Sequence, residues 1–248
     1  MKVEIYIATH KAYNFPKIDG YIPIHVGKAV TDLDLGIIGD NTGDHISELN
    51  PNFCELTALY WMWKNSDADI LGLAHYRRYL KDNIRGNNIF NNQYEVLCID
   101  HIKEAFKMKK NTIFLPDKEK LFYQKYKIKF SVCMKKQYEL NHYKKDWAEV
   151  ENIIQSKFPE YLPALRKVEQ STHISFYNMF IANRDWVNSY CEWLFSILFE
   201  LKQRLDISNY NAYQSRIYGF ISERLFNVYF QYNQEQYSLN YLETFRVE

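Results

Sequence analysis

This chain of 248 residues lacks any long apolar run and any excess of charge. No run approaches the roughly 20 residues that a membrane-spanning helix needs, and Met1 to Glu4 lead directly into a strand pattern without the apolar segment of a signal peptide. We therefore expect a cytoplasmic protein, or one peripheral to the inner face of the membrane. With 31 basic and 30 acidic residues the net charge is +1, which argues against a nucleic-acid binder that relies on a broad cationic face.

Cysteine is also scarce. The four cysteines are widely spaced, form no CxxC pair and stand in apolar or helical surroundings, so we expect free, buried thiols and assign them no chemistry: Cys54, Cys98, Cys133 and Cys191. The length suits one large domain with a sizeable core, or two small domains at most. We expect one.

The most informative segment is an apolar run of strand length, residues 70–74, that ends in His75, Tyr76, Arg77 and Arg78. Open α/β sheets bind ligands at the carboxyl ends of their strands. Because a guanidinium group holds phosphate oxygens two at a time, two arginines at such a strand end indicate an anion site for a diphosphate. The alternative is a pair of surface arginines on a loop.

Strands and helices alternate in the first half of the chain. The patterns predict a buried first strand, an edge strand interrupted by Pro23, a loop with exposed backbone N–H groups, a helix with Asn50 as N-cap, the strand that leads to His75, and a strand closed by Pro116; these cover residues 3–8, 21–27, 39–47, 50–63, 70–75 and 112–116. Residues 81–93 predict a loop. The order strand, helix, strand favours a crossover and a parallel sheet.

The second half is mainly helical. Residues 135–155 predict a helix in which Tyr138, His142 and Asp146 share one face, and residues 173–181 predict a strand. An amphipathic helix follows, with its apolar stripe between Trp186 and Leu201. The last predicted helix, residues 211–232, has a polar face with these residues: Arg216, Gly219, Glu223 and Asn227.

Seven segments in this order resemble one family. They are IATHK at 7–11, PIHVG at 23–27, DNTGD at 40–44, CELTALYW at 54–61, GLAHYRRY at 72–79, NMFI at 178–181 and SERL at 222–225. The chain resembles the domain of unknown function 4422 family over nearly its whole length. These proteins are similar to bacterial glycosyltransferases of capsule, exopolysaccharide and O-antigen synthesis, and some of the group are galactofuranosyltransferases that use UDP-galactofuranose.

The resemblance implies an α/β, GT-A-like (Rossmann-like) fold: a mainly parallel sheet flanked by helices, with a helical C-terminal part. It implies a single glycosyltransferase domain over residues 1–248. The nucleotide-sugar-binding part would cover about 1–120 and the helical, acceptor-side part about 121–248. The implied activity is hexosyl transfer from a UDP-sugar to a lipid-linked saccharide.

Enzymes of this fold commonly hold a divalent cation with an Asp-x-Asp at the end of a central strand. Here Asp67 and Asp69 precede their strand, and we expect them only to cap a turn. At the other end stand His75 and the two arginines. We therefore expect arginine to replace the cation in binding the diphosphate, with no cofactor. A Mn or Mg site elsewhere, with Asp40 or Asp44 beside His45, stays open.

Two sets of residues are candidates for the base that deprotonates an acceptor. One is the pair His142 and Asp146, a helical turn apart, whose alternative is a solvated helix contact. The other is Glu223, whose alternative is a buried ion pair with an arginine such as Arg216.

The remaining assignments concern the two substrates. The resemblance places the following residues on the donor side: Thr9, His10, Lys11, Asp40, Asn41, His75, Tyr76, Arg77 and Arg78. It places His173 and Asn178 on the acceptor side, although His173 alone is as well explained as a satisfied polar residue. His25 and His101 have no motif partner and are interpreted as structural.

Two other functions remain open. A catalytically silent subunit that binds a sugar or nucleotide in a polysaccharide assembly complex would bind nucleotide without turnover. A phosphoesterase would need a dense cluster of carboxylates and histidines, which the sequence lacks. Neither alternative, nor the transferase, involves nucleic acid.

Overall fold

The computed structural model describes residues 1–82, 89–90, 94–126 and 128–247. The chain forms two compact units. Unit 1 contains residues 1–117, 179–191 and 235–248, and unit 2 contains residues 118–178 and 192–234. The division into a donor-side part before about residue 120 and an acceptor-side part after it stays a prediction. The chain leaves unit 1 after residue 117 but returns to it twice, and no local pattern in the sequence indicated these returns.

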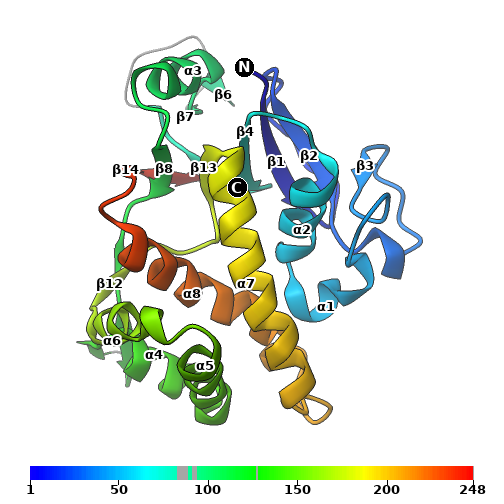
Figure 1. Ribbon diagram of the computed structural model, residues 1–248. Helices are drawn as coiled ribbons and strands as arrows, with labels where there is room; N and C mark the ends of the chain where they lie inside the picture. Colours follow the sequence, from blue (N-terminus) through cyan, green and yellow to red (C-terminus); the bar gives the residue numbers. More distant parts are fainter. Residues whose placement is uncertain (83–88, 91–93, 127, 248) are drawn as a thin grey trace. The chain divides into compact units, whose positions relative to one another are not determined.

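Unit 1 is built on one mixed sheet (Figure 1). The strands along its main path have the order β14-β8-β13-β4-β1-β2-β3. Their bounds are Ser238–Leu242, Thr112–Pro116, Phe180–Asn183, Ile70–His75, Val3–Thr9, Tyr21–His25 and Ile38–Gly39. β1 is parallel to β2 and β4, and β13 runs antiparallel between β4 and β8. The predicted mainly parallel α/β sheet is confirmed.

The centre of the sheet is apolar. In β4 every residue but His75 is buried, and in β1 every residue but Glu4 is buried. Gly72 allows β13 to lie close, because a Cβ there would stand 2.9 Å from Ile181 Cγ1 and 3.1 Å from the Phe180 carbonyl oxygen. Two short strands extend this sheet at its carboxyl edge: β5, Arg78–Leu80, and β15, Thr244–Arg246. The sequence analysis predicted neither of them, nor β14.

The helices of unit 1 are α1 (Asn50–Phe53), α2 (Leu56–Asn65), α3 (Ile99–Met108) and the first part of α7 (Arg184–Arg204). The prediction of one helix over residues 50–63 is wrong. Cys54 has φ of 54° and ends α1, and the Asn50 side chain donates to the Cys54 carbonyl oxygen (2.8 Å) instead of capping a helix start. Two short 3-10 helices lie at Lys28–Val30 and Ser47–Leu49.

The predicted loop over residues 81–93 falls largely outside the described residues. Its described flanks pair as strands: β6 (Ile89–Phe90) with β7 (Tyr94–Glu95), and Lys81 bridges to Val96. The four cysteines are free thiols, as predicted. Cys191 alone is fully buried. Within the described part of the chain, no helix combines the length and apolar character needed to cross a bilayer.

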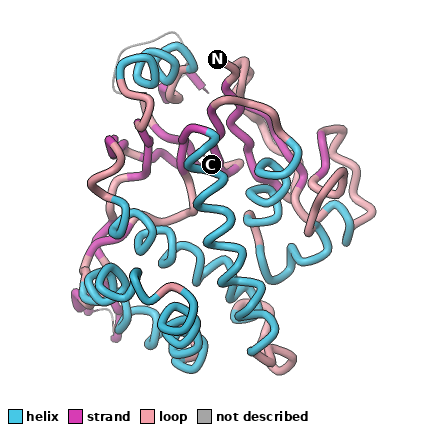
Figure 2. Tube along the Cα trace, viewed as in Figure 1, coloured by secondary structure: helices cyan, strands magenta, loops and turns pink. Residues whose placement is uncertain are grey.

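Unit 2 is mainly helical, as predicted for the C-terminal part (Figure 2). Its helices are α4 (Met134–Asn141), α5 (Lys144–Lys157), α6 (Leu162–Gln170), the second part of α7, and α8 (Ile217–Asn233), with 3-10 turns at Pro159–Tyr161 and Gln214–Arg216. Glu169 on α6 is 2% exposed. It accepts from Trp147 Nε1 (2.7 Å) on α5 and pairs with Lys135 on α4. A buried carboxylate held by three helices keeps them in register.

Two small antiparallel sheets, each of two strands, complete the described part of unit 2. One pairs β9 (Glu119–Lys120) with β12 (His173–Ile174), and the other pairs β10 (Phe122–Lys125) with β11 (Ile128–Ser131). The predicted strand over residues 173–181 is wrong in its middle, because Tyr177 and Asn178 have φ of 75° and 52° and separate β12 from β13. The last helix begins at Ile217 and not at residue 211.

Candidate functional site

The carboxyl ends of three parallel strands lie side by side in unit 1. The register pairs Thr9 of β1 with His25 of β2, and Ala8 of β1 with His75 of β4. Backbone bonds continue the ladder beyond the strands, from Val26 N to Thr9 O (2.8 Å) and from Tyr76 N to Ala8 O (3.2 Å). The sequence-predicted residues that follow β1 and β4 therefore share one edge of the sheet, where open α/β sheets bind ligands.

β4 ends in a tight reversal. His75 pairs with Arg78 across the turn formed by Tyr76 and Arg77, so the two arginines occupy different positions: Arg77 in the turn and Arg78 at the start of β5. Arg78 in turn pairs with Arg246 of β15. Directly opposed residues on antiparallel strands have their side chains on the same face. His75, Arg78 and Arg246 thus form a row across three strands, which we call the cationic row.

Like charges placed directly opposite each other destabilise a sheet unless something offsets them. The row sets the Arg78 and Arg246 positions directly opposite each other. A bound anion would relieve this repulsion. The sequence did not indicate Arg246, because its pairing with Arg78 joins positions that are far apart in the chain and leaves no local signal.

Arg77 adds a second cationic group. Its Nε is buried and has no hydrogen-bond partner among the described residues, and its Cζ lies 4.9 Å from the centre of the Tyr76 ring. The Arg77 carbonyl oxygen accepts from Val247 N (3.0 Å), which fixes the turn. Since a buried donor without a partner costs free energy, this guanidinium group is suited to an acceptor that comes from outside the chain.

The Tyr76 ring contacts residues that follow β1. His10 and Tyr13 contact it edge-on, with ring centres 5.3 and 5.2 Å away, and Lys11 Nζ lies 5.4 Å from its centre. Thr9 is buried and its hydroxyl donates to the Lys11 carbonyl oxygen (2.7 Å), which shapes this loop. Tyr13 was not predicted, because nothing in its local sequence distinguishes it among 21 tyrosines.

Asp40 has a different position from the one expected of a ligand-binding carboxylate. It is 0% exposed and accepts from the backbone N–H of Gly27 (2.9 Å), from that of Lys28 (3.1 Å) and from the Ser47 hydroxyl. These bonds hold the loop after β2 to the loop after β3. Its neighbour Asn41 is exposed.

His25 is 2% exposed at the same edge. Burial, and secondarily the nearby Lys28 charge, lower its pKa, which keeps the imidazole neutral at pH 7. This agrees with a structural role. His101, the other histidine interpreted as structural, has its Nδ1 3.0 Å from the buried carboxylate of Asp82.

Asp67 and Asp69 lie at the amino end of β4, the opposite end from His75. Asp69 accepts from Lys2 N (2.7 Å), and Asp67 pairs with the Lys2 ammonium group. No group of three or more His, Cys, Asp or Glu side chains that could hold a metal ion is found among the described residues. Asp44, which belongs to the alternative metal site left open in the sequence analysis, accepts from the Tyr60 hydroxyl (3.1 Å).

In unit 2, the proposed dyad of His142 and Asp146 is interrupted. The predicted helix breaks at His142 and Tyr143, so the two residues are not one helical turn apart. His142 Nδ1 donates to Gln214 Oε1 (3.0 Å), and burial lowers the His142 pKa to about 4. Asp146 is 1% exposed and accepts from the Tyr210 hydroxyl (2.6 Å), and burial raises its pKa.

Glu223 on α8 accepts hydrogen bonds at both of its carboxylate oxygens. Its Oε1 accepts from Tyr177 N (2.9 Å) and its Oε2 from Arg224 Nη1 (2.8 Å). Arg224 is an arginine partner of Glu223 that the sequence did not indicate. Glu223 therefore holds the left-handed backbone at Tyr177, a conformation that is strained for a residue other than glycine.

The two acceptor-side candidates differ in exposure. His173 is exposed on β12, with Nδ1 2.9 Å from the Thr172 hydroxyl. Asn178 is 0% exposed and follows Tyr177 in the left-handed loop. Close to this loop, Asn227 of α8 bonds both the N–H (2.9 Å) and the carbonyl oxygen (2.8 Å) of Ser175. The loop before β13 is thereby fixed by side chains of α8.

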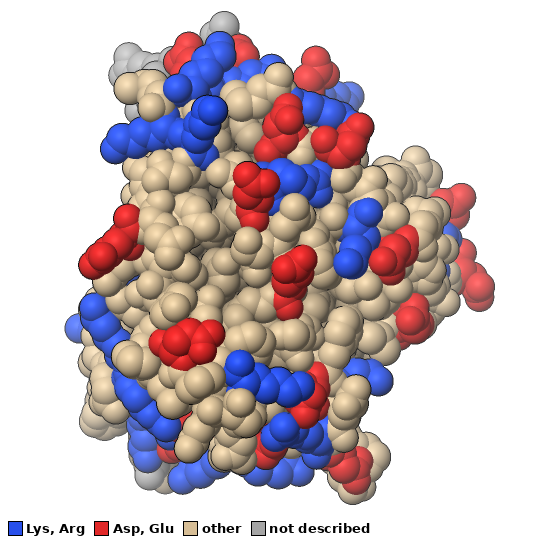
Figure 3. Space-filling view, viewed as in Figure 1, with Lys and Arg blue, Asp and Glu red and all other residues tan. Residues whose placement is uncertain are grey.

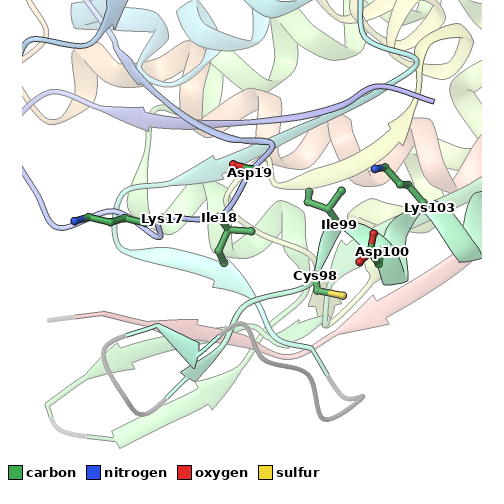
Figure 4. A pocket seen from close by; sticks show the side chains of 7 residues that line it. All are labelled: Lys17, Ile18, Asp19, Cys98, Ile99, Asp100 and Lys103. Carbon is green, nitrogen blue, oxygen red and sulfur yellow. The ribbon is translucent and has the colours of Figure 1, made fainter.

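A cavity of about 440 Å³ is lined by residues other than the predicted site residues (Figure 4). It is lined by Lys17, Ile18, Asp19, Cys98, Ile99, Asp100 and Lys103. Two lysines and two aspartates give it no charge preference, and none of the predicted site residues contributes. The face drawn in Figure 3 likewise intermixes the two signs of charge.

Comparison with known proteins places this geometry in a family. The family model described as "Domain of unknown function (DUF4422)" matches residues 4–234. No curated protein matches the chain. A solved structure, the apo form of the WbbM bifunctional glycosyltransferase, is similar with a TM-score of 0.87 and 32% sequence identity over 100% of this chain, which spans 46% of the WbbM chain. The likeness confirms the predicted fold class. The chain belongs to the DUF4422 family.

Proposed function

We propose that the chain is a glycosyltransferase that moves a sugar from a nucleoside-diphosphate sugar to a saccharide acceptor. Its family and its likeness to a bifunctional glycosyltransferase support the activity in general. The observation that carries the proposal is the cationic row with Arg77 at the carboxyl edge of the sheet.

The proposed chemistry follows from charge. Transfer breaks the bond between the sugar and the diphosphate, so negative charge develops on the departing nucleotide. Arg77 and Arg78 would bind the pyrophosphate oxygens and stabilise that charge, and Arg246 and His75 would extend the same surface. Fixed guanidinium groups supply positive charge without a metal ion, so we propose transfer that needs no cofactor.

The other residues at this edge have supporting roles in the proposal. Tyr76, with His10, Tyr13 and Lys11 around it, offers aromatic and cationic surface to the nucleotide. Thr9 shapes the loop that presents these side chains. Asn41 is the exposed candidate for ribose contacts, and buried Asp40 supports the loop behind it.

On the acceptor side, Glu223 is the stronger candidate base. It is half-buried, and its carboxylate accepts from Tyr177 N and from Arg224 Nη1. His142 and Asp146 have separate partners, which favours structural roles for both. His173 and Asn178 remain proposed acceptor contacts.

The finer proposal is UDP-galactofuranose or UDP-galactose as donor. The acceptor would be a growing lipid-linked polysaccharide of the bacterial surface, such as a capsule or exopolysaccharide. The enzyme would then work in the cytoplasm, at the inner face of the membrane.

A transfer assay tests both the general transferase activity and the proposed donor sugar. The purified protein is incubated with radiolabelled UDP-sugars, including the furanose form, and a synthetic saccharide-lipid acceptor, with and without excess EDTA. We expect transfer from at least one UDP-sugar that persists in EDTA. Activity abolished by EDTA and restored by Mn²⁺ would refute the arginine mechanism. UDP binding without transfer or donor hydrolysis would instead support the non-catalytic subunit.

A further inference from the structure

The β10–β11 hairpin of unit 2 exposes an unusual amount of apolar surface. The pairing from Phe122 with Ser131 to Lys125 with Ile128 forms a two-stranded sheet of its own, drawn in magenta in Figure 2. Phe122, Tyr126, Ile128 and Phe130 are 43%, 87%, 58% and 49% exposed. By the pairing register, Ile128 and Phe130 share one face of the hairpin and Phe122 lies on the other face beside Lys129, so large apolar side chains are exposed on both faces of a short element.

Positive charge accompanies these side chains. From Phe122 to Ser131 the sequence has three lysines and no acidic residue, in a chain whose net charge is only +1. Lys120 and Lys129 place their ammonium groups 5.6 and 5.9 Å from the centre of the Phe122 ring. The hairpin thus exposes aromatic rings and cationic groups together on one short element.

This combination suits one kind of partner. Aromatic side chains favour the boundary between lipid headgroups and acyl chains, and lysines extend along apolar surface while their ammonium groups stay in contact with phosphate. Basic residues near an anionic leaflet add attraction that an uncharged surface would not provide. A protein partner would need an acidic surface that matches the shape of the hairpin, whereas a lipid surface adapts to it.

We propose that the β10–β11 hairpin docks this chain onto anionic lipid bilayers, with Tyr126, Ile128 and Phe130 entering the headgroup region and Lys120 and Lys129 binding lipid phosphates. The inference deepens the membrane association included in the proposed function, since it names the surface responsible. It is tested without turnover, so the two can fail separately.

The test is co-sedimentation of the whole chain with vesicles of phosphatidylglycerol and phosphatidylcholine, compared with phosphatidylcholine alone. We expect binding only to the anionic vesicles and weaker binding at 0.5 M NaCl. Ile128→Ser with Phe130→Ser should lower the partition coefficient at least about tenfold. Lys129→Gln should lower it about fivefold. The matched control is Met108→Ser, which removes an apolar side chain that is 85% exposed on α3.

A second readout uses Tyr126→Trp, whose emission should shift to shorter wavelength on binding and be quenched by brominated lipid. Thermal unfolding confirms that each variant is folded. Wild-type protein that does not bind anionic vesicles, or serine variants that bind like wild type, would overturn the proposal. So would serine variants that lose transfer to a soluble acceptor while still binding vesicles, since the hairpin would then be an acceptor site.

Discussion

The two units present their polar residues in different ways. In unit 1, Tyr76 follows β4 and contacts His10 and Lys11, which follow the neighbouring strand β1, because parallel strands end at the same edge. In unit 2, His142 and Asp146 have the spacing of a helical pair, yet each binds a different partner. Strand ends bring residues together through the sheet, whereas helix spacing does so only while the helix is continuous.

The largest expected effect concerns the arginines of unit 1. Arg77→Ala and Arg78→Ala should each lower kcat/KM for transfer about a hundredfold, roughly 2.7 kcal/mol of transition-state stabilisation. Arg78→Lys should restore part of it, since it keeps the charge and loses the planar fork. Arg204→Ala, which removes an arginine from a pair with Glu149 and Glu200 in unit 2, is the matched control. Near-normal rates in both alanine variants would contradict the mechanism.

The next effect tests the interrupted dyad through pH. Burial lowers the pKa of folded His142 to about 4 from 6.5, so between these values the unfolded chain binds a proton that the folded chain does not. Stability is therefore full above pH 6.5 and falls with acidification, by about 2 kcal/mol between pH 7 and pH 5. Asp146, whose pKa burial raises, contributes with the opposite sign.

Urea unfolding at pH 7 and pH 5 measures this loss of stability. His142→Phe should remove the part of the loss that His142 causes, whereas His173→Phe, at an exposed histidine, should leave the loss unchanged. We expect His142→Phe to retain most of the transfer activity at pH 7. A thousandfold loss of activity with unchanged stability would show that His142 is a base after all.

A smaller effect tests whether Asp40 of unit 1 supports its loop or binds the donor. Asp40→Asn should lower the free energy of unfolding by about 1–2 kcal/mol, because three donors at a buried carboxylate lose a charged acceptor. Exposed Asp32→Asn is the control. Lost UDP affinity at unchanged stability would instead return Asp40 to the donor site.

The smallest effect is expected at the amino end of β4. Asp67→Asn and Asp69→Asn remove exposed pairs with Lys2, so stability should change by less than about 0.5 kcal/mol and transfer by less than about twofold. A large loss of Mn²⁺-stimulated transfer in either variant would point to a metal site there.

These contrasts explain what the sequence could predict. The buried strands before His75 and Pro116 were correct because their apolar runs have strand length and clear ends. The break at His142 was missed because Gln214, far along the chain, donates to the Asn141 carbonyl oxygen (2.8 Å) and accepts from His142, satisfying the end of α4.

Contacts between residues far apart in the chain also limited what could be predicted of the candidate site. The arginines after β4 were found, but the turn at Tyr76 and Arg77 and the pairing of Arg78 with Arg246 depend on β15, which follows α8. A single sequence contains no signal for a contact between strands so far apart. Asp40 was expected at the ligand because loop residues are usually exposed, and only the structure shows its three internal donors.

The most direct test of the central idea is a crystal structure of the chain with bound UDP. The account predicts pyrophosphate oxygens within hydrogen-bond distance of Arg77 or Arg78, at the carboxyl edge of β4. UDP bound with its pyrophosphate away from residues 75–78 and Arg246 would contradict it.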